Sequence, residues 1–168
     1  MDFLVREWQG MDYRSITKYA NNKKIADNLR DGFPYPYTED DAKQFVQDCI
    51  LGDTTRRLMR AIEVDGEAAG SIGVFVQGNI YRKSAEVGYW LGEPFWGRGI
   101  VSGALKEICA QAFDLFDIVR IFAEPFAQNA GSRRALEKAG FTLEGVLQKN
   151  AYKNGSFLDS CMYALLKE

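Results

Sequence analysis

No histidine occurs among the 168 residues of this sequence. Serine-hydrolase triads, Cys-His nucleophiles, the helix-borne histidine pairs of metalloproteases and most catalytic zinc sites all require an imidazole. The absence excludes these classes of enzyme, and we expect no metal site. Any chemistry must use carboxylates, hydroxyls, backbone amides and a reactive group supplied by a bound molecule.

Cysteine is scarce, and long apolar runs are missing. Cys49, Cys109 and Cys161 are odd in number, widely spaced and set among apolar neighbours. We interpret them as reduced, mostly buried thiols rather than disulfides or metal ligands. No apolar run approaches the roughly 20 residues of a membrane span, and no signal-peptide pattern begins the chain. We therefore expect a cytoplasmic protein with no membrane partner.

Clusters of basic residues are also missing. The net charge is −2 and the isoelectric point is near 5.3, and no run of Lys and Arg resembles a nucleic-acid footprint. We expect no nucleic-acid partner, and a cationic or neutral partner fits the charge better. Hydrophobic residues, in contrast, make up 46% of the chain. That share is ordinary for one globular domain, so we expect residues 1–168 to form a single domain.

Apolar spacing and turn signals predict a mixed sheet with flanking helices. Asp65-Gly66 and Lys153-Asn154-Gly155 are hairpin signals, and Thr38 with Asp41 forms a near capping box before a helix that ends near residue 51. Further helices are predicted at 12–29, 99–113 and 129–139. Strands are predicted at 3–6, 58–65, 68–77, 85–91, 118–123, 141–148 and 157–166. The fold class is therefore α/β (α+β).

The most informative segment runs from Glu93 to Ser102 with the sequence EPFWGRGIVS. It lies between an apolar strand and the start of an amphipathic helix, where unpaired N–H groups and a positive dipole end favour an anion. Gly97 and Gly99 would let a phosphate approach the backbone, and Arg98 adds a charge. The alternative is that the two glycines only shape a turn. A Walker A loop and a Rossmann fingerprint both fit this segment poorly.

Residues 96–101 resemble the coenzyme loop of the GNAT superfamily of N-acetyltransferases, Arg/Gln-x-x-Gly-x-Gly/Ala, at this strand-to-helix junction. Gly99 matches the central glycine, whereas Trp96 and Val101 are departures, and Val101 adds bulk beside the expected pyrophosphate. The segments AEVGYWL, AEPFAQNAGS with LEKAGFTLEG, and FPYPYT extend the resemblance over most of the chain. The branch it resembles most is that of the ribosomal-protein N-terminal acetyltransferases.

The resemblance implies a single-domain GNAT fold with about seven strands, mostly antiparallel, and about four helices. It also implies a splayed cleft between strands 86–91 and 118–123 that holds acetyl-CoA as co-substrate. Asn129 would bond the pantetheine arm, residues 97–102 the pyrophosphate, and an N–H near Leu91 the tetrahedral oxyanion. The full set of coenzyme-binding residues that we expect is Tyr89, Trp90, Leu91, Trp96, Gly97, Arg98, Gly99, Ile100, Val101, Ser102, Asn129 and Ser132.

The resemblance further implies direct attack by a primary amine on the thioester in a ternary complex, because no cysteine has an activating context. Glu86 is the candidate base that takes the proton of the amine, and its alternative is a solvent-facing strand residue. Ser132 is the candidate donor to the leaving thiolate, and Tyr152 is its rival. Ser132 or Asn129 could instead serve as the N-cap of the helix that follows.

The acceptor groove is predicted from aromatic and acidic residues. Expected substrate contacts are Phe33, Tyr35, Tyr37, Glu86 and Phe126, and core packing is the alternative for the rings. Glu39, Asp40 and Asp41 could attract a cationic amine or only favour the first turn of a helix. Among acceptors the resemblance favours protein N-terminal α-amines, and polyamines and antibiotic amines stay open.

Two other classes of function stay open at this stage. A non-catalytic acyl-CoA sensor could keep the anion site and lose turnover, and a nucleotide-binding module could use Gly97-Arg98-Gly99 for ATP. The second is disfavoured because no side chain is placed to hold Mg²⁺. Sheet edges and the tail strand 157–166 are candidate surfaces for a homodimer.

Overall fold

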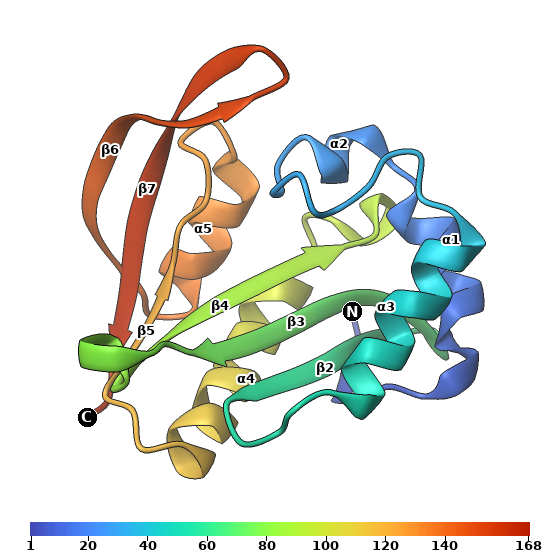
Figure 1. The fold of residues 1–168 in the computed structure, drawn as a ribbon, viewed down its shortest axis with the longest axis horizontal. Coiled ribbons are helices and arrows are strands. Elements are labelled where there is room, and N and C mark those ends of the chain that lie inside the picture. The colour runs from blue at the N-terminus through green and yellow to red at the C-terminus, as the bar shows by residue number, and fades with distance from the viewer.

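The computed structural model describes residues 1–168 as one seven-stranded sheet with helices on both faces (Figure 1). The strands are β1 (Leu4–Arg6), β2 (Arg57–Val64), β3 (Glu67–Val76), β4 (Ser84–Leu91), β5 (Arg120–Ala123), β6 (Thr142–Lys153) and β7 (Ser156–Leu166). The helices are α1 (Tyr13–Ala20), α2 (Lys23–Ala26), α3 (Glu39–Leu51), α4 (Ile100–Leu115) and α5 (Ala130–Lys138). Short 3-10 turns occur at η1 (Gly10–Asp12), η2 (Asn79–Tyr81) and η3 (Glu93–Phe95).

The spatial order of the strands is β1-β2-β3-β4-β5-β7-β6. Every neighbouring pair is antiparallel except β4 and β5, which are parallel and joined through α4. The prediction of a mixed, mostly antiparallel sheet of about seven strands is confirmed. This parallel pair is important for the site because the loop from the end of β4 at Leu91 leads directly into α4 at Ile100.

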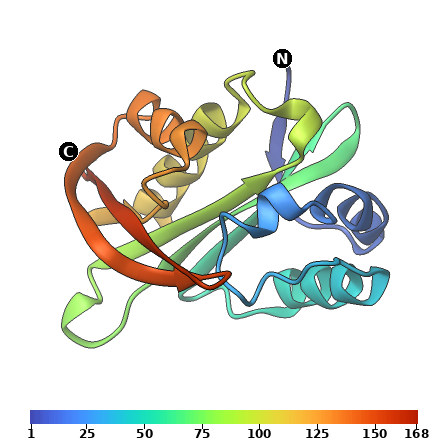
Figure 2. The ribbon, with the colours of Figure 1, turned by 90° about the horizontal axis from the view of Figure 1, so that it is seen from above.

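Two hydrophobic clusters lie on opposite faces of the sheet. The larger one packs α4 and α5 against residues such as Ile72, Val87 and Leu91, and the smaller one packs α1 and α3 against Ala61 and Trp90. Figure 2 shows α1 and α3 on one face and α4 and α5 on the other. Alternation along β4 thus sends successive side chains into two different cores.

Local signals explain most element boundaries. Thr38 and Asp41 form the full capping box of α3, with the Asp41 N–H to Thr38 Oγ1 at 3.2 Å and the Thr38 N–H to Asp41 Oδ2 at 2.9 Å. The hairpin turns at Asp65-Gly66 and Asn154-Gly155 have positive φ at both residues, as a two-residue turn with the right-handed twist requires.

Three local predictions were wrong. The region 12–29 is not one helix, because the Asn22 side chain accepts the Lys24 N–H and starts α2 as a separate helix. The strand expected at 141–148 continues to Lys153, since a register shift between Leu147 and Ala151 absorbs the extra residues. The tail strand β7 is not a free edge, because it pairs with β5 and β6 on its two sides.

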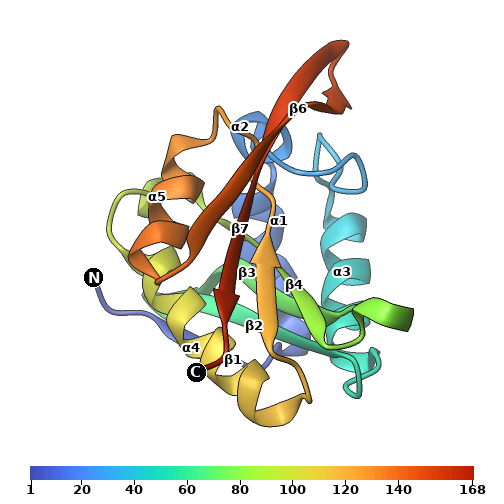
Figure 3. The same cartoon turned by 90° about the vertical axis from the view of Figure 1, so that its left-hand side faces the viewer.

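The long hairpin of β6 and β7 rises beyond the rest of the sheet, toward the end of the molecule where α2 lies (Figure 3). It leans across the carboxyl ends of the parallel strands β4 and β5. The hairpin and the segment after α2 therefore border the same end of the sheet.

Candidate active site

A cavity of about 1170 Å³ follows the gap between β4 and β5. The two strands pair at only three positions, Ser84 with Arg120, Ala85 with Ile121 and Glu86 with Phe122. β4 continues to Leu91 without a partner on that side, and its residues from Glu86 onward line the cavity. Unpaired strand edges are costly unless another molecule satisfies them, so the gap is suited to an extended ligand that carries amide groups.

One end of the cavity is formed by backbone. None of the N–H groups of residues 97–102 donates a hydrogen bond within the protein, and all six residues line the cavity. Gly97 has φ 74° and Gly99 has φ 77°, and a Cβ placed on either would meet no atom within 4 Å. The left-handed backbone turns these amides toward open space at the start of α4, where the helix dipole favours a negative charge.

We call residues 97–102 the cradle. Trp96 and Val101, the two departures from the family's loop pattern, have structural roles beside it and within it. The Trp96 indole N–H donates to the Leu91 carbonyl at 2.7 Å, which ties the loop to the end of β4. Val101 is partly buried and packs against the larger core. Arg98, Arg134 and Lys138 also line the cavity and bring three positive charges to it. The cradle therefore combines free amides with nearby cations, a combination that binds phosphate groups.

The start of α5 forms the opposite wall of the gap. Asn129 is the N-cap of α5, and its side-chain oxygen accepts the Ser132 N–H at 3.2 Å, so the alternative role weighed for Asn129 is confirmed. The Ser132 hydroxyl lies 2.5 Å from the Tyr89 hydroxyl, which comes from β4. Burial raises the pKa of Tyr89, so its hydroxyl stays protonated at neutral pH. This contact places an O–H pair across the cavity from one strand to one helix.

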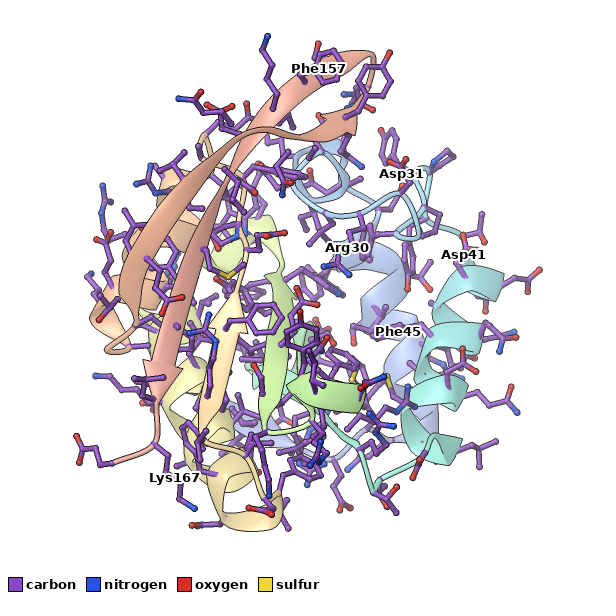
Figure 4. All side chains as sticks on the ribbon, turned by 60° about the vertical axis from the view of Figure 1, so that its left-hand side comes forward. Arg30, Asp31, Asp41, Phe45, Phe157 and Lys167 are labelled. Carbon is purple, nitrogen blue, oxygen red and sulfur yellow. The ribbon has the colours of Figure 1, made fainter.

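The other end of the cavity is formed by charged side chains. Glu86 is 21% exposed, and its carboxylate lies 2.9 Å from the guanidinium of Arg30, which is 79% exposed. Burial raises the pKa of Glu86, the charge of Arg30 opposes that rise, and the charge of Glu124 adds to it. Figure 4 shows Arg30 between the segment that follows α2 and the sheet.

The side chains of Glu86 and Tyr89 lie on opposite faces of β4. Glu86 shares its face with Trp90, whose ring packs edge-on against Phe33 at 5.8 Å in the smaller core. Tyr89 lies on the face of the larger core. Because side chains alternate along a strand, the carboxylate approaches the gap from the side of α1 and α3, and the hydroxyl pair approaches from the side of α4 and α5.

The mouth beside Glu86 is narrowed by the β6–β7 hairpin. Lys153 Nζ lies 3.1 Å from Asp31, and Asn154 Nδ2 lies 3.0 Å from Asp27, so the hairpin contacts the segment around α2. Tyr152 is 64% exposed and packs against Phe157 at the hairpin tip. Figure 4 labels Asp31 on the segment after α2 and Phe157 on the hairpin.

Most of the predicted site residues lie together along the cavity. Those lining it are Phe33, Glu86, Tyr89, Trp90, Leu91, Trp96, Gly97, Arg98, Gly99, Ile100, Val101, Ser102, Phe126, Asn129, Ser132 and Tyr152. Two predicted substrate contacts do not line it. Tyr37 is buried in the smaller core against Phe33, and Tyr35 points to solvent with 53% of its surface exposed.

The predicted acidic cluster also lies away from the cavity. Asp41 completes the capping box of α3, and Glu39 pairs with Lys43 one turn later at 3.5 Å. Sequence reasoning missed Arg30, Asp31, Glu124 and Lys153, which do line the cavity. Their sequence positions carry no motif, and no periodicity could have assigned them, because they come from three separate segments.

The structure also describes the cysteines, the possible metal ligands and the helices that could span a membrane. All three cysteines are free thiols, and Cys109 and Cys161 are buried. Burial raises the pKa of Cys109 to about 12, so this thiol is not a nucleophile at neutral pH. No group of three or more side chains is arranged to hold a metal ion. None of the helices is both long and apolar enough to cross a bilayer.

Comparison with protein families gives a match between residues 2–142 and the acetyltransferase (GNAT) domain. The ribosomal-protein-serine acetyltransferase of Escherichia coli (strain K12) is 30% identical over 128 residues, which cover 76% of this chain and 71% of that protein. Three relatives from Bacillus subtilis, at 34% to 35% identity over 60% or 61% of this chain, are matched over only 56% of their own length. The chain thus spans little more than half of those relatives.

Solved structures show the same fold. The microcin C7 self-immunity acetyltransferase MccE, in complex with acetyl-CoA and AMP, superposes with a TM-score of 0.84 at 25% identity, over 99% of this chain and 93% of that one. RimL, the ribosomal L7/L12 α-N-protein acetyltransferase in complex with coenzyme A, gives a TM-score of 0.84 at 26% identity, over 98% and 93%. Both likenesses extend over nearly the whole chain.

Proposed function

The chain belongs to the GNAT family of N-acetyltransferases, and we propose that it transfers the acetyl group of acetyl-CoA to a primary amine, with protein N-terminal α-amines as the favoured acceptors. The observation that carries this proposal is the cradle of six unpaired amides opening onto the gap between β4 and β5. A relative named for ribosomal-protein acetylation supports the amine acceptor. Similar structures in complex with acetyl-CoA or coenzyme A support the acetyl donor.

The cavity fits coenzyme A at three levels. The amides of residues 97–102 would hold the pyrophosphate, and Arg98, Arg134 and Lys138 would balance phosphate charge. The free edge of β4 between Val87 and Leu91 would bond the amides of the pantetheine arm. The volume of about 1170 Å³ is large enough for such a molecule with room for an acceptor.

Glu86 would take the proton of the amine. An amine that is protonated in water must lose a proton before its nitrogen can attack the thioester carbon. The raised pKa of Glu86 makes it a better proton acceptor than an exposed carboxylate, and it lies at the acceptor end of the cavity. Glu86 would pass this first proton to solvent and, as the new C–N bond forms and the C–S bond breaks, take the second proton that the nitrogen must lose to become an amide.

Ser132 would give a proton to the leaving sulfur. Its hydroxyl lies at the start of α5 on the wall of the gap, and the Tyr89 hydroxyl can donate a hydrogen bond to it at 2.5 Å, which stabilises the oxygen until a proton returns to it from solvent. Tyr152 is the rival donor, but it lies at the exposed hairpin tip next to Phe157. We therefore assign the donor role to Ser132 and a position at the acceptor mouth to Tyr152.

Thermal unfolding with acetyl-CoA, coenzyme A, ATP or buffer tests the cradle without a known acceptor. A ligand at 100 times its dissociation constant adds about 2.7 kcal/mol to the free energy of unfolding. We expect stabilisation by both coenzyme forms and none by ATP. Stabilisation by ATP that exceeds that by coenzyme A would reject the proposal in favour of a nucleotide site.

Thiol release with a peptide acceptor then tests transfer. The acceptor is a short peptide with a free N-terminus, and the matched control is the same peptide with an acetylated N-terminus. We expect release of coenzyme A only with the free amine. Binding of acetyl-CoA without release on any peptide, amino acid or polyamine would indicate a non-catalytic binding protein.

A further inference from the structure

The two partners of the Arg30–Glu86 ion pair at the acceptor end differ in their exposure to solvent. Glu86 is mostly shielded, whereas Arg30 reaches it from a solvent-exposed position after α2, and this carboxylate is the only protein group that the guanidinium bonds. A guanidinium has five N–H donors in a planar fork. The other donors of Arg30 form no hydrogen bond within the protein and are available to an acceptor in the cavity that Arg30 lines.

An acceptor that is only a cation fits this arrangement poorly. Its ammonium would have to displace Arg30 from Glu86, which leaves the guanidinium without a partner, or bind next to it and be repelled. Lys153 adds a second positive charge to the same end, and its side chain is only 9% exposed. A polyamine, with several ammonium groups and no carboxylate, would meet both cations.

We propose that the acceptor of this acetyltransferase carries a carboxylate close to its reacting amine, and that Arg30 binds this carboxylate while Glu86 receives the ammonium. Binding then exchanges one ion pair for two, and no charge at the acceptor end loses its partner. This inference rests on the proposed function, since it concerns the acceptor half of the same cavity.

Two sources could supply this chemistry. The carboxylate is either the α-carboxylate of a free amino acid or the side chain of Asp or Glu at the first position of a peptide. Asp31, on the segment after α2, pairs with Lys153 of the hairpin at 3.1 Å, which leaves Arg30 as the cation at Glu86. In both sources the recognised unit is an ammonium and a carboxylate only a few bonds apart.

Matched acceptors isolate the carboxylate. Peptides beginning with Asp or Glu are compared with those beginning with Asn or Gln, and free amino acids with their amides. We expect the carboxylated member of a pair to have a kcat/KM higher by on the order of 10- to 100-fold, as for a charge-assisted hydrogen bond. The pair with the larger ratio identifies the source.

Variants of Arg30 test whether this residue causes the preference for carboxylated acceptors. Arg30→Gln should remove the preference, Arg30→Lys should restore part of it, and Arg82→Gln should leave it unchanged. Arg82 is a matched control because it is exposed, bonds only the Asn79 carbonyl, and lies outside the cavity. Arg30→Gln should also move the acidic limb of the pH-rate profile to higher pH, since the charge of Arg30 lowers the pKa of Glu86. A simple contact at the surface would not move this limb.

Calorimetric binding of the same acceptors to the protein saturated with coenzyme A separates this inference from the proposed function. Carboxylated acceptors that bind more tightly, but never release thiol from acetyl-CoA, would reject the transferase and leave the recognition site standing. Efficient turnover with equal binding and equal kcat/KM within each pair would reject the carboxylate site alone. A preference that persists in Arg30→Gln would also reject it.

Discussion

The two ends of the cavity differ in the groups that line them: backbone amides at one end and charged side chains at the other. The coenzyme end is a continuous stretch of backbone, residues 97–102, whose amides are unpaired because a helix begins there. The acceptor end is a set of side chains, Arg30, Glu86, Glu124 and Lys153, from four separate segments. One end depends on local backbone conformation, and the other depends on how distant segments pack.

This difference separates general chemistry from specificity. The cradle can serve any acyl donor with a pyrophosphate, because backbone amides are the same in every residue. The acceptor end can differ from one relative to the next through single side-chain changes on loops and hairpin tips, where substitutions are tolerated. Family membership thus identifies the donor more securely than the acceptor.

The largest expected effect comes from removing the base at the acceptor end. Glu86→Gln should lower kcat on the order of 100- to 10,000-fold, the range for loss of general-base catalysis. The wild-type rate should fall as pH falls through the raised pKa of Glu86, because only the carboxylate accepts a proton, and this acidic limb should vanish in the variant. Thiol release across pH measures both effects. An unchanged binding constant for acetyl-CoA would show that the coenzyme end is intact, whereas a near-normal rate would exclude Glu86 as base.

At the coenzyme end, Gly99→Ala should weaken binding of acetyl-CoA about tenfold. A left-handed conformation costs a residue with a Cβ about 1 to 2 kcal/mol, and Gly99 has φ 77°. Gly10→Ala is the control, because that glycine has no positive φ and no neighbour within 4 Å of a Cβ. Calorimetric titration with acetyl-CoA compares the two. Equal affinities would mean that the cradle is not the pyrophosphate site.

Between the two ends, Tyr89→Phe removes the hydroxyl that contacts Ser132 at 2.5 Å. We expect kcat to fall about fivefold at saturating coenzyme, the effect of one lost hydrogen bond. Tyr81→Phe is the control, since Tyr81 is 67% exposed and lies outside the cavity. If Ser132→Ala leaves kcat unchanged, the donor role moves to Tyr152 or to solvent.

The smallest effect should come from the contact between the hairpin and the α2 segment. Asp31→Asn removes the partner of Lys153, and it should raise the KM of the acceptor about twofold while changing stability by less than about 1 kcal/mol, because Asp31 is 86% exposed. Asp117→Asn is the control, because Asp117 is 88% exposed, pairs with Lys83 and lies outside the cavity. Initial rates and thermal unfolding of both variants are compared. A KM shift of the same size in Asp117→Asn would show that the mouth contact has no particular role.

Much of the fold could be predicted from local sequence. The hairpins at Asp65-Gly66 and Asn154-Gly155 and the capping box of Thr38 depend on neighbouring residues only, and each is confirmed. The break at Asn22 and the bulge in β6 were missed because a helical or apolar pattern continues across them. For β7, alternation indicates a strand but carries no information about its neighbours in the sheet.

The sequence by itself determined the chemistry that is available: no imidazole, a glycine-rich start to a helix, and a carboxylate on the strand before it. The last two properties lie on one continuous stretch of chain, residues 86–102. Only the tertiary structure decided that Tyr89 meets Ser132 and that Arg30 meets Glu86, 43 and 56 positions apart. Such contacts depend on sheet order and loop packing, because side chains far apart in sequence are brought together by the burial of the two cores and by no local rule.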